Sequence, residues 1–333
     1  MIWKRFAEVL LERVDREAPA TRDSLVSNLF DRLVHHPLSA DESARTVQLL
    51  QKELARRAGE QKARTWMEYA SLTLEKEQDQ LLQAELSKQV AVGIPGFERL
   101  VAGLPACSTE LLVGPPGSGK TTLCKQYVLE GLREGQACVM VSTTEDKVLF
   151  EQELQRISGL DIAGFLASGQ LSFIDVYSWT HGGRATGLHN GVYASASPHL
   201  DDVSLAIHYA MEGTPHKRIK RMAFDTLSTL FLHNPPEQVL RFTELLRGRL
   251  NSACFTTLLA VEEGMHPPEV LRALNTVTDG TLLMSADGSG HYASLPRLRG
   301  SPAVLTHLPL EFTQRGLRVA DVWQSLGPSQ PKR

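Results

Sequence analysis

The stretch Gly114-Pro115-Pro116-Gly117-Ser118-Gly119-Lys120-Thr121 decides how most of this chain folds. Its spacing, G-x-x-x-x-G-K-[ST], lets a glycine-rich backbone curl around phosphate oxygens, which the N–H groups of the loop and of the next helix then bind. In such loops the lysine reaches the β and γ phosphates, and the hydroxyl of the last residue ligates Mg²⁺. The apolar run Glu110–Val113 precedes the loop, and a helix-like segment follows it. We therefore predict a nucleoside triphosphate site that extends to Thr122.

Composition sets limits on the class of protein. The 333 residues are 42% hydrophobic and 22% charged, as in a globular protein with one large or two modest domains. A formal net charge of −3 does not support a strongly basic nucleic-acid platform. The four cysteines are scattered without a C-x-x-C pair, which favours a reduced, cytoplasmic protein without zinc. We see no apolar stretch of about 18 residues and no signal peptide, so we expect no membrane insertion.

The first 88 residues differ from the rest. They are rich in Leu, Glu, Gln, Arg and Ala, and Gly59 is their only glycine. Apolar residues recur at helical spacing, and Asp41 or Ser43 is expected to open a long helical stretch. We therefore predict an all-α region over residues 1–88. It either binds a partner protein or another copy of the chain, or packs as a helical cap on the domain that follows.

From residue 89 to residue 322 the pattern changes to alternating strands and helices with glycine turns, which indicates an α/β fold with a mostly parallel sheet flanked by helices. Strands are predicted at Thr109–Val113, Cys138–Ser142, Leu171–Val176, Met222–Asp225, Phe255–Val261 and Gly280–Met284. Helices are predicted at Lys120–Glu134, Asp146–Ile157, Leu200–Met211, Pro236–Asn251 and Pro267–Leu274.

Two segments are expected to carry little regular structure. The loop from Trp179 to Pro198 is rich in Gly, Ala and Ser. Its His181 and His189 have no carboxylate or cysteine at ligand spacing, so we do not expect a metal site there. The tail at residues 323–333 is expected to be disordered.

A phosphate-binding loop needs a carboxylate that holds Mg²⁺ through its water shell, at the end of a neighbouring buried strand. Met222-Ala223-Phe224-Asp225 is a short apolar run that ends in such an acid. Thr226 follows and is a candidate to bond the attacking water or the γ-phosphate. The alternative is that Asp225 caps the next helix.

Hydrolysis also needs a group that orients or deprotonates water. Glu145 follows a predicted strand and is the first candidate, with Asp146 as the second. Either acid could instead stabilise the N-terminus of the next helix. Glu262 and Glu263 are weaker candidates that end a later strand, as loop or interface acids.

Together with the phosphate-binding loop and the candidate acids, further motifs in residues 92–322 resemble the KaiC-like branch of the RecA superfamily of P-loop ATPases. A Gly93-Ile94-Pro95-Gly96 turn precedes the first core strand, Thr278-Asp279-Gly280 leads into a late strand, and a closing hairpin follows. The resemblance implies a RecA-like core that binds ATP and Mg²⁺. It also implies a homo-oligomeric ring, expected to be a hexamer, with ATP between neighbouring subunits.

Two features of the resemblance concern catalysis. Arg297 and Arg299 match basic hairpin residues that act on the neighbouring subunit's nucleotide in the family, although the first is usually lysine. The alternative is that both arginines form surface salt bridges. Thr144 stands where the family commonly has the first of two glutamates, usually the catalytic base. Turnover is then slow, or it depends on Glu145.

These features predict an ATP-binding, ATP-hydrolysing oligomeric switch, regulatory or mechanochemical, with the N-terminal helices docking an unidentified protein. A non-hydrolysing nucleotide-binding scaffold is the alternative that Thr144 motivates. A recombinase-like DNA-binding role is less favoured. The basic run from His216 to Arg221 is more simply a solvated entry to a strand than a nucleic-acid contact.

Overall fold

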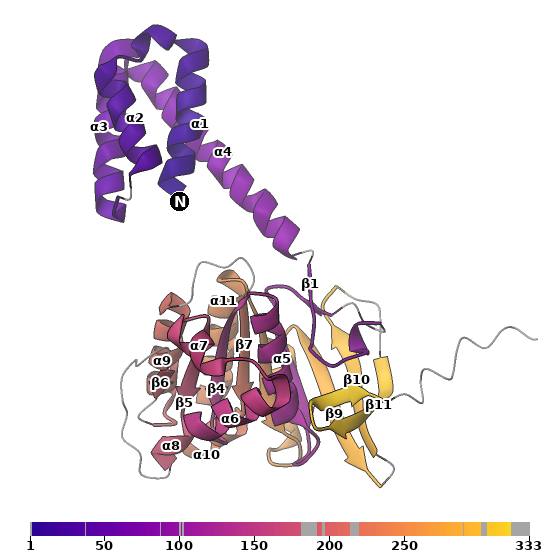
Figure 1. Cartoon of the computed structure of the whole chain (residues 1–333). Helices are drawn as coiled ribbons and strands as arrows, with labels where there is room; N and C mark the ends of the chain where they lie inside the picture. Colours follow the sequence, from indigo (N-terminus) through magenta and orange to yellow (C-terminus); the bar gives the residue numbers. More distant parts are fainter. Residues whose placement is uncertain are drawn as a thin grey trace, which may run out of the picture. The chain divides into compact units, whose positions relative to one another are not determined.

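Figure 1 shows the computed structural model of the chain. The residues it describes are 2–36, 38–86, 88–99, 101, 103–180, 192–194, 197–213, 220–288, 290–300 and 305–320. The chain divides into two compact units, Met1–Ala84 and Glu85–Arg333. No helix in these described ranges is long and apolar enough to cross a membrane. His181, His189 and the tail at 323–333 lie outside the described residues.

The N-terminal unit is helical. Its elements are α1 (Ile2–Glu17), a 3₁₀ turn (Pro19–Thr21), α2 (Ser24–His35), α3 (Ala40–Ala58) and α4 (Glu60–Leu86). The apolar faces of the helices meet in one cluster that includes Leu10, Phe30, Leu54 and Trp66. The Trp66 indole also donates to Glu17 Oε2 at 2.6 Å, so this buried ring has a partner for its polar atom.

The helix boundaries in this unit differ from the predicted ones. Ser39, rather than Asp41 or Ser43, caps α3, and it forms a reciprocal capping box with Glu42. The expected long helical stretch breaks at Gly59, whose φ of 90° ends α3 in a conformation that side chains disfavour. The result is two helices, which can pack against α1 and α2 from different directions.

The second unit is built on one large sheet. Its strands are β3 (Thr109–Gly114), β4 (Ala137–Ser142), β5 (Leu171–Asp175), β6 (Val192–Ala194), β7 (Lys220–Asp225), β8 (Phe255–Glu262), β9 (Gly280–Asp287), β10 (Gly290–Leu298), β11 (Leu305–Thr313) and β12 (Gly316–Val319). In the described ranges they lie in the order β12-β11-β10-β9-β3-β8-β7-β4-β5-β6. The strands from β9 to β6 run parallel, and β9 to β12 are antiparallel.

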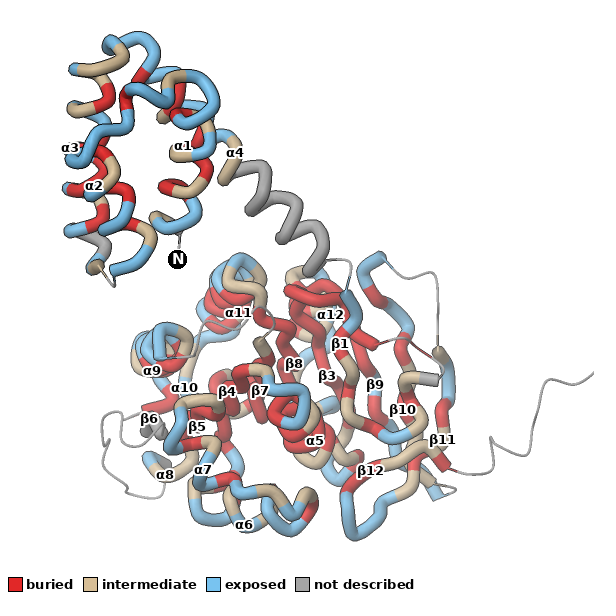
Figure 2. Tube along the Cα trace, turned by 45° about the horizontal axis from the view of Figure 1, so that its top comes forward, coloured by how far each residue is buried: buried red, intermediate tan, exposed pale blue. Residues whose placement is uncertain are grey.

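Helices cover both faces of the sheet (Figure 1). They are α5 (Lys120–Arg133), α6 (Lys147–Ser158), α7 (Ile162–Ala167), α8 (Tyr177–Thr180), α9 (Leu200–Gly213), α10 (Ser228–His233), α11 (Pro236–Ser252) and α12 (Pro268–Val277). Side chains alternate along the strands: Leu112 joins a core with α5, α6 and α7, whereas Leu111 and Val113 join a core with α9 to α12. Figure 2 shows that β3, β4, β7 and β8 are buried between these layers.

A short segment leads into the sheet. The strands β1 (Gln89–Val90) and β2 (Leu104–Pro105) pair antiparallel around a 3₁₀ turn (Phe97–Arg99). Gly93 has a φ of 87°, and a Cβ there would come within 2.7 Å of the Gln126 carbonyl oxygen. Only glycine therefore lets this segment lie directly on α5.

The predicted α/β architecture is confirmed. All six predicted strands and all five predicted helices are present, with boundaries that shift by a few residues at most. The closing hairpin corresponds to β10, β11 and β12. The strand β6 lies inside the loop where no element was predicted. Its three residues pair with β5 and form one edge of the described sheet, so its position depends on tertiary structure.

The prediction of a fully reduced chain is wrong for one pair of cysteines. Cys107 and Cys254 form a disulfide across a sequence separation of 147 residues, whereas Cys124 and Cys138 are buried free thiols. Cys107 lies just before β3 and Cys254 just before β8, and these strands are neighbours in the sheet. The scattered spacing of the cysteines cannot show this proximity.

The predicted solvated entry to β7 is also incorrect at its last residue. Arg221 is fully buried, and its guanidinium donates to Glu134 Oε2 at 2.8 Å and stacks over the Tyr127 ring. It therefore serves to fasten α5 to the sheet and is not available to nucleic acid. Residues 214–219 lie outside the described residues.

Candidate nucleotide site

The glycine-rich loop lies at the carboxyl end of β3, in the middle of the parallel sheet, which is the edge where open α/β sheets bind ligands. The loop turns from β3 into α5, whose first helical residue is Lys120. Gly119 has a φ of 101°, and a Cβ there would lie 2.9 Å from the Phe312 ring. A side chain at residue 119 would therefore meet both backbone strain and a collision.

The Lys120 ammonium is buried at this loop. It donates to the carbonyl oxygens of Gly114 and Pro115, each at 2.8 Å, and to Glu262 Oε2 at 2.9 Å. These three acceptors match the three donors of a lysine side chain. The positive charge is thus held inside the loop, where the phosphates of a nucleotide would lie.

Asp225 ends β7 and is 1% exposed. Burial raises the pKa of Asp225, and hydrogen bonds from Thr121 and Thr144 act in the opposite direction. The bond from Thr144 Oγ1 to Asp225 Oδ2 is 3.2 Å long. The last residue of the loop motif and the predicted acid thus meet in the folded chain, although 104 positions separate them in the sequence.

The hydroxyl and the N–H of Thr226 both have partners within this unit. Its hydroxyl donates to the Ala260 carbonyl oxygen at 2.8 Å, and its N–H donates to Thr143 Oγ1 at 2.9 Å. Thr226 is buried, and these bonds fix the turn after β7 against β8 and the end of β4. The structure therefore shows a structural role for Thr226 at this turn.

The two acids predicted as water-orienting groups have other partners. Glu145 Oε2 accepts from Lys125 at 2.7 Å, and burial raises the pKa of Glu145. Asp146 caps α6 by accepting from the Leu149 N–H at 2.9 Å, which is the alternative the sequence allowed. Thr144, by contrast, contacts Asp225. The residue that replaces the expected glutamate therefore faces Asp225, the acid predicted to hold Mg²⁺, and Glu145 is bonded to α5.

Glu262, one of the weaker candidates, is in direct contact with the loop. Its strand β8 lies between β3 and β7, and Gly114 is paired with Glu262 in the register of β3 and β8. The neighbouring Glu263 has an exposed side chain. Strand order was needed to see this, because the sequence does not show that β8 is inserted between the loop strand and the strand of Asp225.

Arg297 and Arg299 lie at the other end of the sheet. Arg297 pairs with Thr281 near the start of β9, and its guanidinium donates to the Thr278 carbonyl oxygen at 2.9 Å. Arg299 donates to Asp279 Oδ1 at 3.2 Å. Neither arginine is brought to the loop of its own chain.

An aromatic pair beside the loop was not predicted. Phe312, on β11, is 46% exposed and lies against Gly119. The His291 ring meets it edge-on, with centroids 4.6 Å apart, and the buried His291 Nδ1 has no partner in the described structure. Phe312 lies 198 residues beyond Gly114, and one aromatic residue in a hairpin gives no signal of this proximity.

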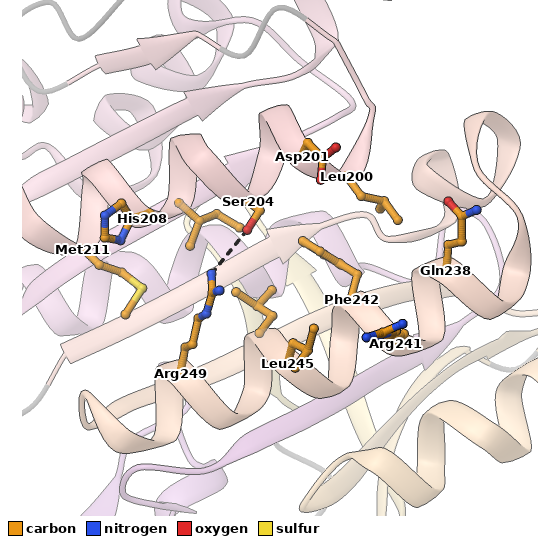
Figure 3. A pocket seen from close by; sticks show the side chains of 12 residues that line it. Leu200, Asp201, Ser204, His208, Met211, Gln238, Arg241, Phe242, Leu245 and Arg249 are labelled. Atoms are coloured by element: carbon orange, nitrogen blue, oxygen red, sulfur yellow. Dashed lines mark hydrogen bonds between the residues drawn. The ribbon is translucent and has the colours of Figure 1, made fainter.

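A hollow of about 440 Å³ lies away from the loop, between α9 and α11 (Figure 3). Apolar side chains such as Ile207 and Phe242 line it, and Arg249 donates across it to Ser204 at 3.4 Å. It contains none of the residues predicted for nucleotide chemistry. The candidate site therefore remains the loop and its neighbours.

Comparison with known proteins agrees with this geometry. A family model described as "ATPase: KaiC" matches residues 90–321, which is more than two thirds of the chain. The chain belongs to the KaiC family of ATPases. The match begins at β1 and ends just after β12, so the KaiC-family ATPase domain coincides with the sheet unit and leaves out the N-terminal helices.

Relatives of this KaiC-family chain include UPF0273 proteins of two archaea. That of Aeropyrum pernix is 29% identical over 69% of this chain and 93% of its own length. That of Methanopyrus kandleri is 27% identical over 70% of this chain and 92% of its own length. Among solved structures, a KaiC-like protein of Pyrococcus horikoshii OT3 is similar in fold, with a TM-score of 0.58 at 22% identity, over 70% of this chain and 99% of that one.

Proposed function

We propose that this chain binds ATP with Mg²⁺ and hydrolyses it, and that it works as an oligomeric switch, regulatory or mechanochemical. The observation that carries the proposal is the meeting of Lys120, Thr121 and Asp225 at one edge of the sheet. Lys120 would bind the β and γ phosphates, and the first turn of α5 would add its N–H groups. Family membership supports the same activity.

The donor set suits Mg²⁺, which prefers hydroxyl, carboxylate and water oxygens. The Thr121 hydroxyl would bind the ion directly, and Asp225 would hold it through water. Burial of Asp225 raises its pKa and so favours a cationic neighbour when the acid is ionised. When bound, the ion would neutralise charge on the transferring phosphoryl group.

The exposed Phe312 ring is a flat apolar surface beside the loop. Stacking of a nucleotide base on an aromatic ring is favourable whatever the base. We therefore propose that Phe312 supports the adenine ring, with the unpartnered His291 Nδ1 nearby as a polar group.

The position of the two arginines supports an oligomer. Arg297 lies near Gly280, and Gly280 is paired with Glu110, four residues before Gly114. That is about 13 Å along the strand from the loop, too far for Arg297 or Arg299 to reach their own nucleotide. They would serve as phosphate clamps for a neighbouring copy, in a ring for which a hexamer is the expected size.

The remaining parts of the chain complete the proposal. We assign residues 89–322 to the ATPase domain. The helical region at 1–88 is the docking or oligomerisation module for a protein partner. Its separate apolar core supports a unit of its own.

The test combines three measurements on the full chain: binding of a fluorescent ATP analogue, phosphate release, and light scattering during gel filtration with and without Mg-ATP. We expect micromolar or tighter binding, measurable release, and an oligomer that Mg-ATP stabilises. A chain that binds no ATP contradicts the proposal.

A specific observation favours a second function, that of a nucleotide-binding scaffold without hydrolysis. Thr144 carries no carboxylate and contacts Asp225, and Glu145 is already paired with Lys125 through its Oε2 atom. Tight ATP binding with no phosphate release above background would select the scaffold.

A further inference from the structure

Glu262 occupies the point in the sheet where the two halves of the nucleotide site meet. Its strand β8 is flanked by β3, which ends in the phosphate loop, and by β7, which ends in Asp225. The side chain is 25% exposed, so it is neither locked in the core nor fully in solvent. A carboxylate at this point can reach the γ-phosphate region from the sheet.

The bond between Glu262 and Lys120 cannot persist unchanged when ATP binds. Lys120 is bonded to the carbonyl oxygens of Gly114 and Pro115 and to Glu262, and only the last of these acceptors is an anion. A phosphate that takes a donor of Lys120 brings negative charge beside the carboxylate. Like charges at this distance repel, so the Glu262 carboxylate moves away from the lysine.

The backbone around Glu262 is fixed, which limits that movement to the side chain. The Glu262 N–H donates to Ser228 Oγ at 2.9 Å, and Ser228 Oγ is 2.8 Å from His266 Nε2. The next N–H, that of Glu263, donates to the Gly114 carbonyl oxygen at 2.9 Å. The released carboxylate therefore stays beside the loop, within one side-chain length of the lysine.

The other acids near the site have partners that do not compete with phosphate. Glu145 is bonded to Lys125, and Asp225 accepts from Thr121 and Thr144. Among the acids that the described structure places near the loop, Glu262 is the one that is paired with Lys120. Lys120 is also the group that would bind the phosphates of ATP.

We propose that Glu262 holds Lys120 in the nucleotide-free chain and, once the γ-phosphate takes the lysine, orients the attacking water. This rests on the proposed ATPase function and assigns to Glu262 the role that Thr144 cannot fill. The water oxygen forms a bond to the γ phosphorus, and the bond from that phosphorus to the β–γ bridging oxygen breaks with its electron pair leaving on ADP. One proton of the water passes to Glu262 and then to solvent.

The experiment compares Glu262→Gln with Glu263→Gln, a matched control whose side chain is exposed, in the full-length chain. Dissociation constants for ATP and ADP and the rate of phosphate release are measured on both variants and on the wild type. Circular dichroism checks that each variant is folded, and Glu262→Ala provides a second test if the glutamine variant is not.

We expect Glu262→Gln to release phosphate at least about a hundredfold more slowly, the loss typical of a missing general base. It should bind ATP about twofold to fivefold more tightly, because a competing partly exposed ion pair is gone. The gain for ADP should be smaller, and Glu263→Gln should match the wild type. The measurement of affinity does not depend on turnover.

Two results overturn the inference, and they are distinct from failure of the proposed function. Phosphate release by Glu262→Gln at the rate of an active wild type removes the catalytic role. Weaker ATP binding by the same variant would show that Glu262 does not compete with ATP for Lys120. A wild type that binds ATP and releases no phosphate instead contradicts hydrolysis itself, and with it the catalytic part of this inference.

Discussion

At the carboxyl ends of the parallel strands, the charged groups Lys120, Asp225 and Glu262 meet around a loop of backbone N–H groups. At the amino ends of the same strands, Asp279 lies in a denser network. It accepts bonds from four donors, the Thr109 N–H and the side chains of Arg247, Asn251 and Arg299. The carboxyl end pairs its lysine with groups that a phosphate can replace, whereas the donors around Asp279 at the amino end all come from its own chain. A high density of charged groups therefore does not by itself indicate a ligand site. A better indication is a charged group, such as Lys120, whose present partners a ligand can replace.

The substitution Lys120→Ala tests most directly whether the carboxyl end of the sheet binds the phosphates. We expect loss of detectable ATP binding, because the variant lacks the cation that pairs with the β and γ phosphates. Fluorescent-analogue titration measures it. Lys147→Ala, which removes an exposed cation on α6, serves as the control and should bind like the wild type. Retained tight binding by Lys120→Ala would mean that the phosphates bind elsewhere.

The arginines test whether the amino end also serves a neighbouring subunit. Arg299→Ala should keep ATP binding but slow phosphate release by about a thousandfold, the loss typical of a missing arginine finger. Its bond to Asp279 is partly exposed, so the effect on stability should stay below about 1 kcal/mol.

Arg272→Ala, an exposed arginine on α12, is the matched control for Arg299→Ala. Mixing the Arg299→Ala chain with an equal amount of Lys120→Ala chain should restore part of the activity, since an intact arginine then faces an intact loop. An unchanged rate for Arg299→Ala alone would leave the arginine as a structural group of the amino end.

Glu110, at the amino end, should make the stability of the folded chain depend on pH. Burial at the amino end raises the pKa of Glu110 from 4.5 to about 7, although a hydrogen bond from Ser108 opposes the shift. The folded chain therefore binds this proton more tightly than the unfolded chain does. The contribution to stability is full below pH 4.5 and is lost as the pH rises through about 7.

Glu110→Gln should remove this pH dependence, which amounts to about 3 kcal/mol at most. Urea unfolding from pH 5 to pH 8 measures it, with Glu263→Gln as an exposed-acid control. The Glu110→Gln curve should fall less between these values than the curves of the wild type and the control. Parallel curves would show that Glu110 does not keep its proton in the folded chain.

The smallest effect is expected at the rim of the carboxyl end. Phe312→Ala should weaken ATP binding about tenfold, in line with the loss of one base–aromatic stack. Phe312→Trp should retain the affinity, because it keeps a ring at the same position. The same titration gives both values. Equal affinities for the wild type and Phe312→Ala would place the base away from this ring.

Much of the sheet could be read from the sequence, because its strands are apolar runs that end at glycines or acids. The loop at 114–121 and Asp225 were found in this way, since each lies directly at the end of such a run. The position of Glu145 after a strand predicts a water-orienting acid, and the structure instead pairs Glu145 with Lys125. Two neighbouring residues after β4 have different partners: Thr144 contacts Asp225, and Glu145 contacts Lys125. The apolar pattern of a strand does not show at which residue the strand ends, so it cannot predict which of the two faces Asp225.

Local features follow directly from the sequence: the alternation of strands and helices, the phosphate loop and the separate helical N-terminal region. These follow from periodicity and glycine placement over a few residues. Three contacts arise only in the folded chain: Glu262 with Lys120, Phe312 with Gly119, and the disulfide between Cys107 and Cys254. Each of these pairs depends on the order in which strands enter the sheet, and that order is set by long-range packing that no short stretch of sequence records.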